Sequence, residues 1–127
     1  MAIKFKVIGK KNPRQPSDPV KFYAHTSLDG EVDLLELCKE IEKISTVSEA
    51  DIMAVLSSLV AVVPDKLANG RIVRIGDLGD FRPSVSSKGH DTEKEVTSAS
   101  IKKNKIVFRP GKRIRNVLKL AEYKKVQ

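Results

Sequence analysis

The sequence is poor in the residues on which several classes of protein depend. It contains one cysteine, no tryptophan and only six phenylalanine or tyrosine residues. One cysteine excludes an internal disulfide framework, and Cys38 lies in an apolar stripe, where a free thiol usually acts as a small hydrophobic side chain. The sequence contains no run of about 18 apolar residues, so it predicts no membrane span. The first residues lack the apolar core of a signal peptide. These absences predict a protein of the reducing cytoplasm.

Groups that carry catalysis or bind metals are equally scarce. His25 and His90 have no partner at metal-ligand spacing and are interpreted as surface residues. Gly76 and Gly79 resemble part of a phosphate-binding loop but lack its Lys and Ser or Thr, so a turn between strands is the better interpretation. The sequence predicts no enzyme, no metal site, no cofactor and no small-molecule substrate.

Charge is abundant and unevenly distributed. The chain has 24 basic and 16 acidic side chains, a formal charge of +8. Residues 1–24 hold six basic and one acidic side chain (+5), residues 25–70 three and nine (−6), and residues 71–127 fifteen and six (+9). A basic face separate from an acidic one is typical of a surface that binds a polyanion. Nucleic acid is favoured over a membrane because no segment forms a basic amphipathic helix with large apolar side chains.

The first 30 residues predict two short strands. Apolar and polar residues alternate over 3–7 and 20–24, and a loop rich in proline separates them at 10–19. The two strands could pair as a hairpin or add to the edge of a larger sheet.

Two helices are expected next. Apolar residues at helical spacing from Val32 to Ile44 predict the first. Ser48 followed by Asp51 three residues later indicates the start of the second. Pro64 predicts a kink or restart of that helix, and Asn69–Gly70 its C-terminal end.

The last third of the chain predicts a sheet and a final helix. A strand over 71–75 leads to a turn at 76–81, which opens a second strand. A polar ribbon over 82–101 follows, then a strand at 106–108 and a helix from Lys112.

Several of these pieces, in this order, carry a resemblance to a known family. Two of them are the helix start at Ser48–Asp51 and the direct passage from Gly70 into the next strand. The turn at 76–81 is similar to the Gly-Phe-Gly-Thr-Phe turn of that family. The stretch Phe-Arg-Pro-Gly-Lys at 108–112 is similar to its Phe-Lys-Pro-Gly-Lys signature. Over residues 32–119 the chain resembles the bacterial histone-like HU/IHF proteins. Its first 30 residues make it similar to the longer HU-related subgroup with an N-terminal extension.

The resemblance implies an α+β fold built as an intertwined homodimer, with a helical base, a β-saddle and two β-ribbon arms around double-stranded DNA in the bacterial nucleoid. The expected domains are an extension over 1–30 and an HU-like domain over 31–127, with the arm at about 83–104. A core shared between the two copies is expected from Leu56, Leu59, Val73, Phe81 and Phe108, because one copy alone would cover these side chains poorly.

The resemblance also implies which residues contact DNA. Arg109 and Lys112 match the basic residues around the Pro-Gly of the family signature, and Arg115 and Lys119 continue the same helix face. The ribbon is lined by further basic residues. The expected DNA-binding set is Arg82, Lys88, Lys94, Lys102, Lys103, Lys105, Arg109, Lys112, Arg115 and Lys119.

The arm tip departs from the family pattern. No proline lies between Pro83 and Pro110, so the wedge that kinks DNA in strongly bending relatives is absent. Acidic residues stand at the tip instead: Asp91, Glu93 and Glu95. A gentler wrap that recognises DNA shape is therefore expected.

Two other functions stay open. The acidic tip favours an alternative, an HU-like protein-interaction or structural module with weak or no DNA binding. RNA binding is a third option, against which the scarcity of aromatic residues argues.

The extension itself has two interpretations. In the first interpretation, the basic residues of the extension enlarge the DNA-binding surface. These residues are Lys4, Lys6, Lys10, Lys11 and Arg14. In the other, its strands only cover a hydrophobic edge or adjust the dimer.

Overall fold

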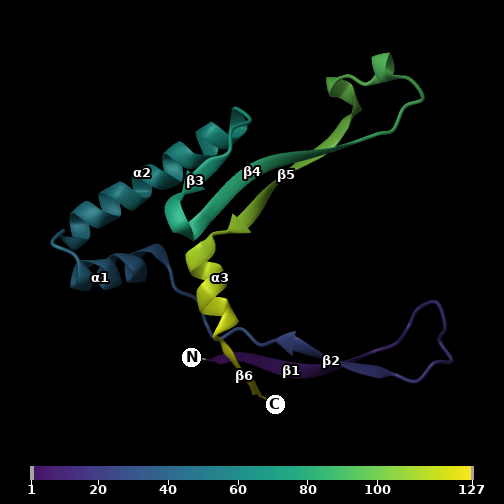
Figure 1. Ribbon diagram of the computed structural model, residues 1–127, viewed down its shortest axis with the longest axis horizontal. Coiled ribbons are helices and arrows are strands. Elements are labelled where there is room, and N and C mark those ends of the chain that lie inside the picture. Colours follow the sequence, from purple (N-terminus) through teal and green to yellow (C-terminus); the bar gives the residue numbers. More distant parts are fainter. Residues whose placement is uncertain (1, 127) are drawn as a thin grey trace. The chain divides into compact units, whose positions relative to one another are not determined.

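The structure, a computed structural model, describes residues 2–126 and divides into two compact units. One unit joins residues 2–33 with residues 117–126, and the other spans Leu34–Asn116. Among the described residues there are three α-helices and two sheets of three strands each (Figure 1). The expected α+β class is confirmed.

Helices α1 (Leu34–Ile44) and α2 (Glu49–Ala68) form the helical part of the second unit. The Ser48 hydroxyl accepts a hydrogen bond from the Asp51 N–H (3.3 Å), which confirms the expected cap. The Glu42 carboxylate accepts from the Glu49 N–H and so satisfies a second free donor at this helix start. Cys38 and Ile52 are buried, so the lone thiol acts as a core side chain.

Helix α2 runs through Pro64 to Ala68 without a break, so the expected restart at Pro64 is wrong. A proline removes its own amide donor and its ring crowds the carbonyl four residues before it, but residues from Asp65 onward keep their amide donors and continue the helix. The expected C-terminal end is confirmed. Gly70 has a φ of +78°, and its N–H donates to the Leu67 carbonyl (3.0 Å).

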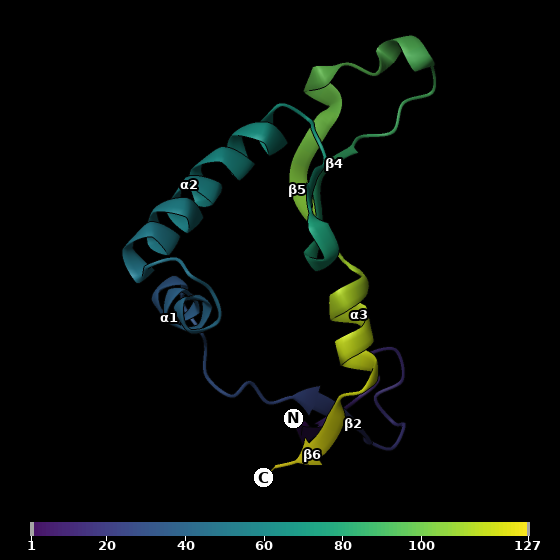
Figure 2. The same cartoon turned by 60° about the vertical axis from the view of Figure 1, so that its left-hand side comes forward.

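The sheet of the second unit is antiparallel, in the order β3 (Val73–Ile75), β4 (Gly79–Ser87) and β5 (Ile101–Pro110). Strands β4 and β5 run side by side as a ribbon that ends in two short 3-10 turns, Glu93–Glu95 and Ser98–Ser100 (Figures 1 and 2). Helix α3 (Lys112–Lys119) follows β5 after a single residue.

The sheet of the first unit has the order β2–β1–β6. Strands β1 (Ala2–Lys10) and β2 (Lys21–Thr26) form an antiparallel hairpin, one of the two expected arrangements. Strand β6 (Glu122–Lys125) adds to β1 in parallel and was not expected from the sequence. Its four residues show no clear apolar alternation, and its partner lies at the other end of the chain.

Candidate nucleic-acid interface

Strand pairing sorts the side chains of the β3–β4–β5 sheet onto two faces. Residues opposite each other on antiparallel strands share a face, and neighbours along a strand alternate between faces. Phe81 lies opposite both Val73 and Phe108, and the two phenyl rings have centroids 5.0 Å apart. The next pair on the same face is Pro83 with Ile106. This face of the sheet is therefore apolar.

The opposite face is rich in positive charge. Asp80 lies opposite Arg74 on one neighbouring strand and Arg109 on the other, in one row across all three strands. The partners of Ser84 and Ser86 on β5 are also basic. We call this set the basic ribbon face, and its members are Arg74, Arg82, Lys103, Lys105 and Arg109.

Arg82 differs from the other members because it already has an anionic partner. Its Nη2 lies 3.3 Å from Asp80 Oδ1, and its Nε lies 3.4 Å from the same oxygen. Both side chains are half-buried, at 25% and 20% exposure. A phosphate that approached Arg82 would have to compete with this carboxylate.

Three lysines expected to contact DNA lie apart from the basic ribbon face. Lys102 falls at the irregularity where the β4–β5 register shifts, and no residue of β4 lies opposite it. Lys88 and Lys94 lie at the tip, beyond the paired part of the ribbon. Three acidic residues share the tip with them: Asp91, Glu93 and Glu95.

The tip is organised around the buried Ser100. Its hydroxyl lies 2.9 Å from His90 Nε2 and accepts from the Thr97 N–H (3.1 Å). Its carbonyl accepts from the Lys88 N–H (2.9 Å). His90 Nδ1 also lies 3.7 Å from Glu95 Oε2. His90 is a surface residue, as expected, and its side chain, 23% exposed, has partners at the tip that the sequence did not predict.

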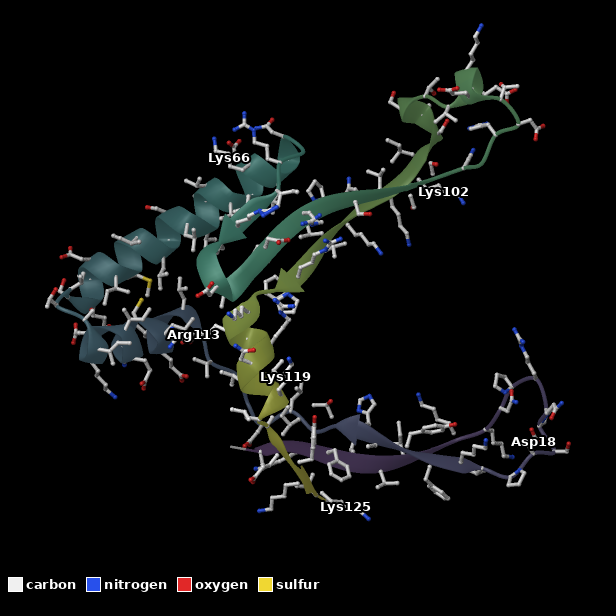
Figure 3. The ribbon with its side chains drawn as sticks, in the orientation of Figure 1. Asp18, Lys66, Lys102, Arg113, Lys119 and Lys125 are labelled. Atoms are coloured by element: carbon white, nitrogen blue, oxygen red, sulfur yellow. The ribbon has the colours of Figure 1, made fainter. Side chains whose placement is uncertain are left out.

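Helix α3 carries the remaining expected contacts. Lys112 and Arg115 are three residues apart, and Lys119 lies one turn beyond Arg115, so the three share a helix face. Figure 3 labels Lys119 at the end of this helix and Arg113 near its start. Arg113 adds a further charge to the first turn that sequence reasoning did not select.

Two glycines join the turn before β4 to the start of α3. Gly111 donates its N–H to the Leu78 carbonyl (2.9 Å), and a Cβ at Gly111 would collide with the carbonyl of Asp77. Gly79 has a φ of +147°, and a Cβ there would meet the Arg109 carbonyl. The glycines are therefore required by close backbone approach, which confirms the interpretation of this stretch as a turn.

A family model described as "HU domain fused to wHTH, Ig, or Glycine-rich motif" (HU-HIG) matches residues 1–125. The chain belongs to the HU-HIG family. The expected resemblance to HU-related proteins with an N-terminal extension is confirmed, because the match includes the first 30 residues.

One solved structure has a fold similar to that of this HU-HIG chain. It is the crystal structure of a "Putative bacterial DNA binding protein" from Bacteroides vulgatus ATCC 8482, with a TM-score of 0.67 and 13% identity. The match covers 98% of this chain and 48% of the other, so this chain spans about half of that structure's length. At this identity the likeness establishes the fold alone. No curated protein matches the chain.

The residues expected to form a shared core are incompletely covered within one HU-HIG chain. Leu56, Val73 and Phe81 are half-buried, whereas Leu59 and Phe108 are 40% and 43% exposed. The homodimer itself stays a prediction.

Two kinds of feature are absent from residues 2–126. No described helix is long and apolar enough to cross a membrane. No cluster of three metal-ligating side chains occurs in that part of the chain.

Arg74 is the member of the basic ribbon face that sequence reasoning overlooked. Its signal was present, since basic and β-branched residues are interleaved in the 71–75 stretch. Only the pairing of β3 with β4 places Arg74 in the same row as Arg109.

Proposed function

We propose that this HU-HIG protein is a non-enzymatic, histone-like DNA-binding protein of the bacterial nucleoid. It binds double-stranded DNA as a homodimer, with little dependence on base sequence, and wraps or compacts it.

The observation that carries this proposal is the separation of charge across the β3–β4–β5 sheet. The basic ribbon face holds five basic residues and one acidic residue, Asp80, for a formal charge of +4. Phosphate contacts from such side chains supply essentially all of the affinity of sequence-independent DNA binding. Helix α3 begins one residue after β5, and its first turn contributes three more basic side chains: Lys112, Arg113 and Arg115.

The ribbon tip argues for a gentle wrap over a sharp kink. A kink needs an apolar wedge between base pairs. The tip has no proline, and Val96 is the one large apolar side chain among its mostly polar or charged residues. Contacts to phosphates and to groove shape then position the protein without identifying bases.

Dimer formation is supported by the amount of surface that one chain exposes. The chain has 10999 Å² of accessible surface. Two separate compact bodies with the masses of its two units would expose roughly 8,000 Å². A second copy on the apolar face of Val73, Phe81 and Phe108 would cover one part of this excess.

A second candidate function is a protein-interaction module with the same fold and weak DNA binding. The observation in its favour is the tip, where three carboxylates accompany two lysines. Negative charge there would repel phosphates and suit a basic protein partner.

The test is fluorescence anisotropy of a labelled duplex at several salt concentrations. Each phosphate contact contributes a slope of about −0.9 in log K against log salt. The Arg109→Ala, Lys112→Ala, Arg115→Ala variant should reduce the slope by roughly two to three units per chain. An unchanged slope would mean that these residues do not face DNA, and no binding at low salt would favour the interaction module.

The dimer is tested separately, by light scattering during gel filtration. The expected mass is twice the 14.1 kDa of one chain. A monomer at all accessible concentrations would contradict this part of the proposal.

A further inference from the structure

The β2–β1–β6 sheet also has two chemically different faces. Ile3, Phe5 and Val7 alternate along β1 with Lys4, Lys6 and Ile8. The pairing register extends both sets across the sheet. One face is mainly apolar and comprises Ile3, Phe5, Val7, Phe22, Ala24 and Tyr123, with Thr26 and Lys125 opposite Phe5. The opposite face, which we call the lysine face, contains Lys4, Lys6, Lys10, Lys21 and Lys124, together with Ile8, Tyr23 and His25.

The lysine face is assembled from three separate parts of the chain. Lys10 lies opposite Lys21 in the hairpin, and Lys4 lies opposite Lys124 of the C-terminal strand. Like charges directly opposite each other destabilise a sheet. Two such pairs on one small sheet therefore work against folding and favour a bound anion that would neutralise them.

Little within the unit neutralises these charges. Lys4 forms an ion pair with Asp29 at 3.0 Å. The other four lysines form no ion pair with any residue of the described 2–126 range. Glu122 is the one acidic residue on the same face of the three strands.

The lysine face continues into a hollow of about 570 Å³ at the loop end of the hairpin. Lys10, Lys11 and Lys21 line it together with Tyr23 and Asp18. The three ammonium groups outnumber the single carboxylate. Figure 3 shows Asp18 in the loop that joins β1 to β2.

We propose that the lysine face is a second phosphate-binding surface for the backbone of double-stranded DNA. This inference rests on the proposed DNA-binding function and adds a contact surface to it. Lysines act as mobile point charges that suit phosphates without recognising bases.

The distribution of apolar side chains favours DNA over an anionic membrane. A membrane-binding surface combines lysines with large apolar side chains that insert beside them. Here Phe5, Phe22 and Tyr123 share the opposite face of the sheet. The lysine face itself holds two large side chains with apolar parts, Ile8 and Tyr23, against five lysines, so its chemistry favours phosphate contacts over insertion.

The experiment uses the full chain and three variants that each lose three positive charges. The sheet variant is Lys6→Gln, Lys10→Gln, Lys21→Gln. The control variant is Lys39→Gln, Lys43→Gln, Lys66→Gln, on α1 and α2. The ribbon variant is Lys103→Gln, Lys105→Gln, Arg109→Gln. Anisotropy against salt is measured for each with the same labelled duplex, and thermal unfolding is followed in parallel.

The sheet variant should lower the salt slope by roughly two to three units per chain, and the control variant should keep the wild-type slope. The melting temperature of the sheet variant should not fall, because the Lys10–Lys21 repulsion has been removed. This combination would distinguish a lost contact from a damaged fold.

The remaining outcomes separate this inference from the proposed function. A sheet variant with the wild-type slope beside a weakened ribbon variant would overturn the inference alone. A weakened sheet variant beside an unchanged ribbon variant would support the inference and move the main DNA surface away from the ribbon. Equal losses in the sheet and control variants would overturn the inference, since net charge alone would then explain binding. Binding of the full chain and the sheet variant to anionic phospholipid vesicles is measured as well, and an unchanged DNA slope with lost vesicle binding would overturn the inference in favour of a membrane.

Discussion

The two three-stranded sheets both have an apolar and a basic face, yet they are built differently. Strands β3, β4 and β5 come from one continuous segment, whereas β6 of the other sheet comes from the opposite end of the chain. Phe81 and Phe108 contact each other on the first apolar face, while Phe22 and Tyr123 on the second are each 71% exposed. The apolar face of the locally assembled sheet is thus the better covered of the two within one chain.

The largest expected effect comes from the apolar faces. Phe81→Ala should destabilise the protein by about 3–4 kcal/mol, because the ring packs on Phe108 and the proposed dimer would complete its burial. Phe22→Ala should cost about 1 kcal/mol or less, since most of that ring is in solvent. Urea unfolding at fixed protein concentration measures both, and equal losses would mean that the two apolar faces are buried to the same degree.

The glycines provide the next comparison. Gly111→Ala should cost about 1–3 kcal/mol, because its Cβ would meet the backbone of Asp77, which cannot move independently of the turn. Gly9→Ala in β1 should cost less, because its Cβ would meet only the side chains of Val20 and Phe22.

Thermal unfolding of the two glycine variants gives the measurement. Gly89→Ala serves as a control, with no atom near the new Cβ. A larger loss for the β1 variant would contradict the close approach of Gly111 to the turn.

Truncation before Glu122 should weaken the first sheet selectively. It removes β6 and leaves β1 and β2 as a two-stranded hairpin, which is marginally stable in water. Hydrogen exchange of β1 amides should accelerate by about tenfold, which corresponds to about 1.4 kcal/mol. Amides of β4 and β5 serve as the internal control, and their equal acceleration would show that the whole protein had been destabilised.

The smallest effect concerns Asp80. Asp80→Asn should tighten DNA binding by at most about fivefold, because it frees Arg82 from an ion pair worth about 1 kcal/mol or less. Asp77→Asn makes the same change of charge in the turn and is the matched control. Anisotropy at one salt concentration compares them, and an equal gain in both variants would argue against a special role for the Asp80–Arg82 pair.

Most elements of this protein follow from local patterns. The Ser48 cap, the Gly70 helix end and the turn bounded by Gly76 and Gly79 each depend on residues a few positions apart. Helix α2 shows the limit of such patterns, because it continues through Pro64 although a proline usually kinks or breaks a helix. The positions of Lys103, Lys105 and Arg109 on a strand were also foreseeable, but their shared face with Arg74 was not.

The sequence by itself determined the order of elements, the uneven charge and the motifs that indicated the family, because these depend on neighbouring residues. The tertiary structure alone decided which side chains share a face. Pairing register places Asp80 between Arg74 and Arg109, and it brings Lys124 opposite Lys4 across almost the whole length of the chain. A shift of one residue in either register would exchange the two faces. For that reason the basic surfaces of this protein are properties of strand pairing as much as of composition.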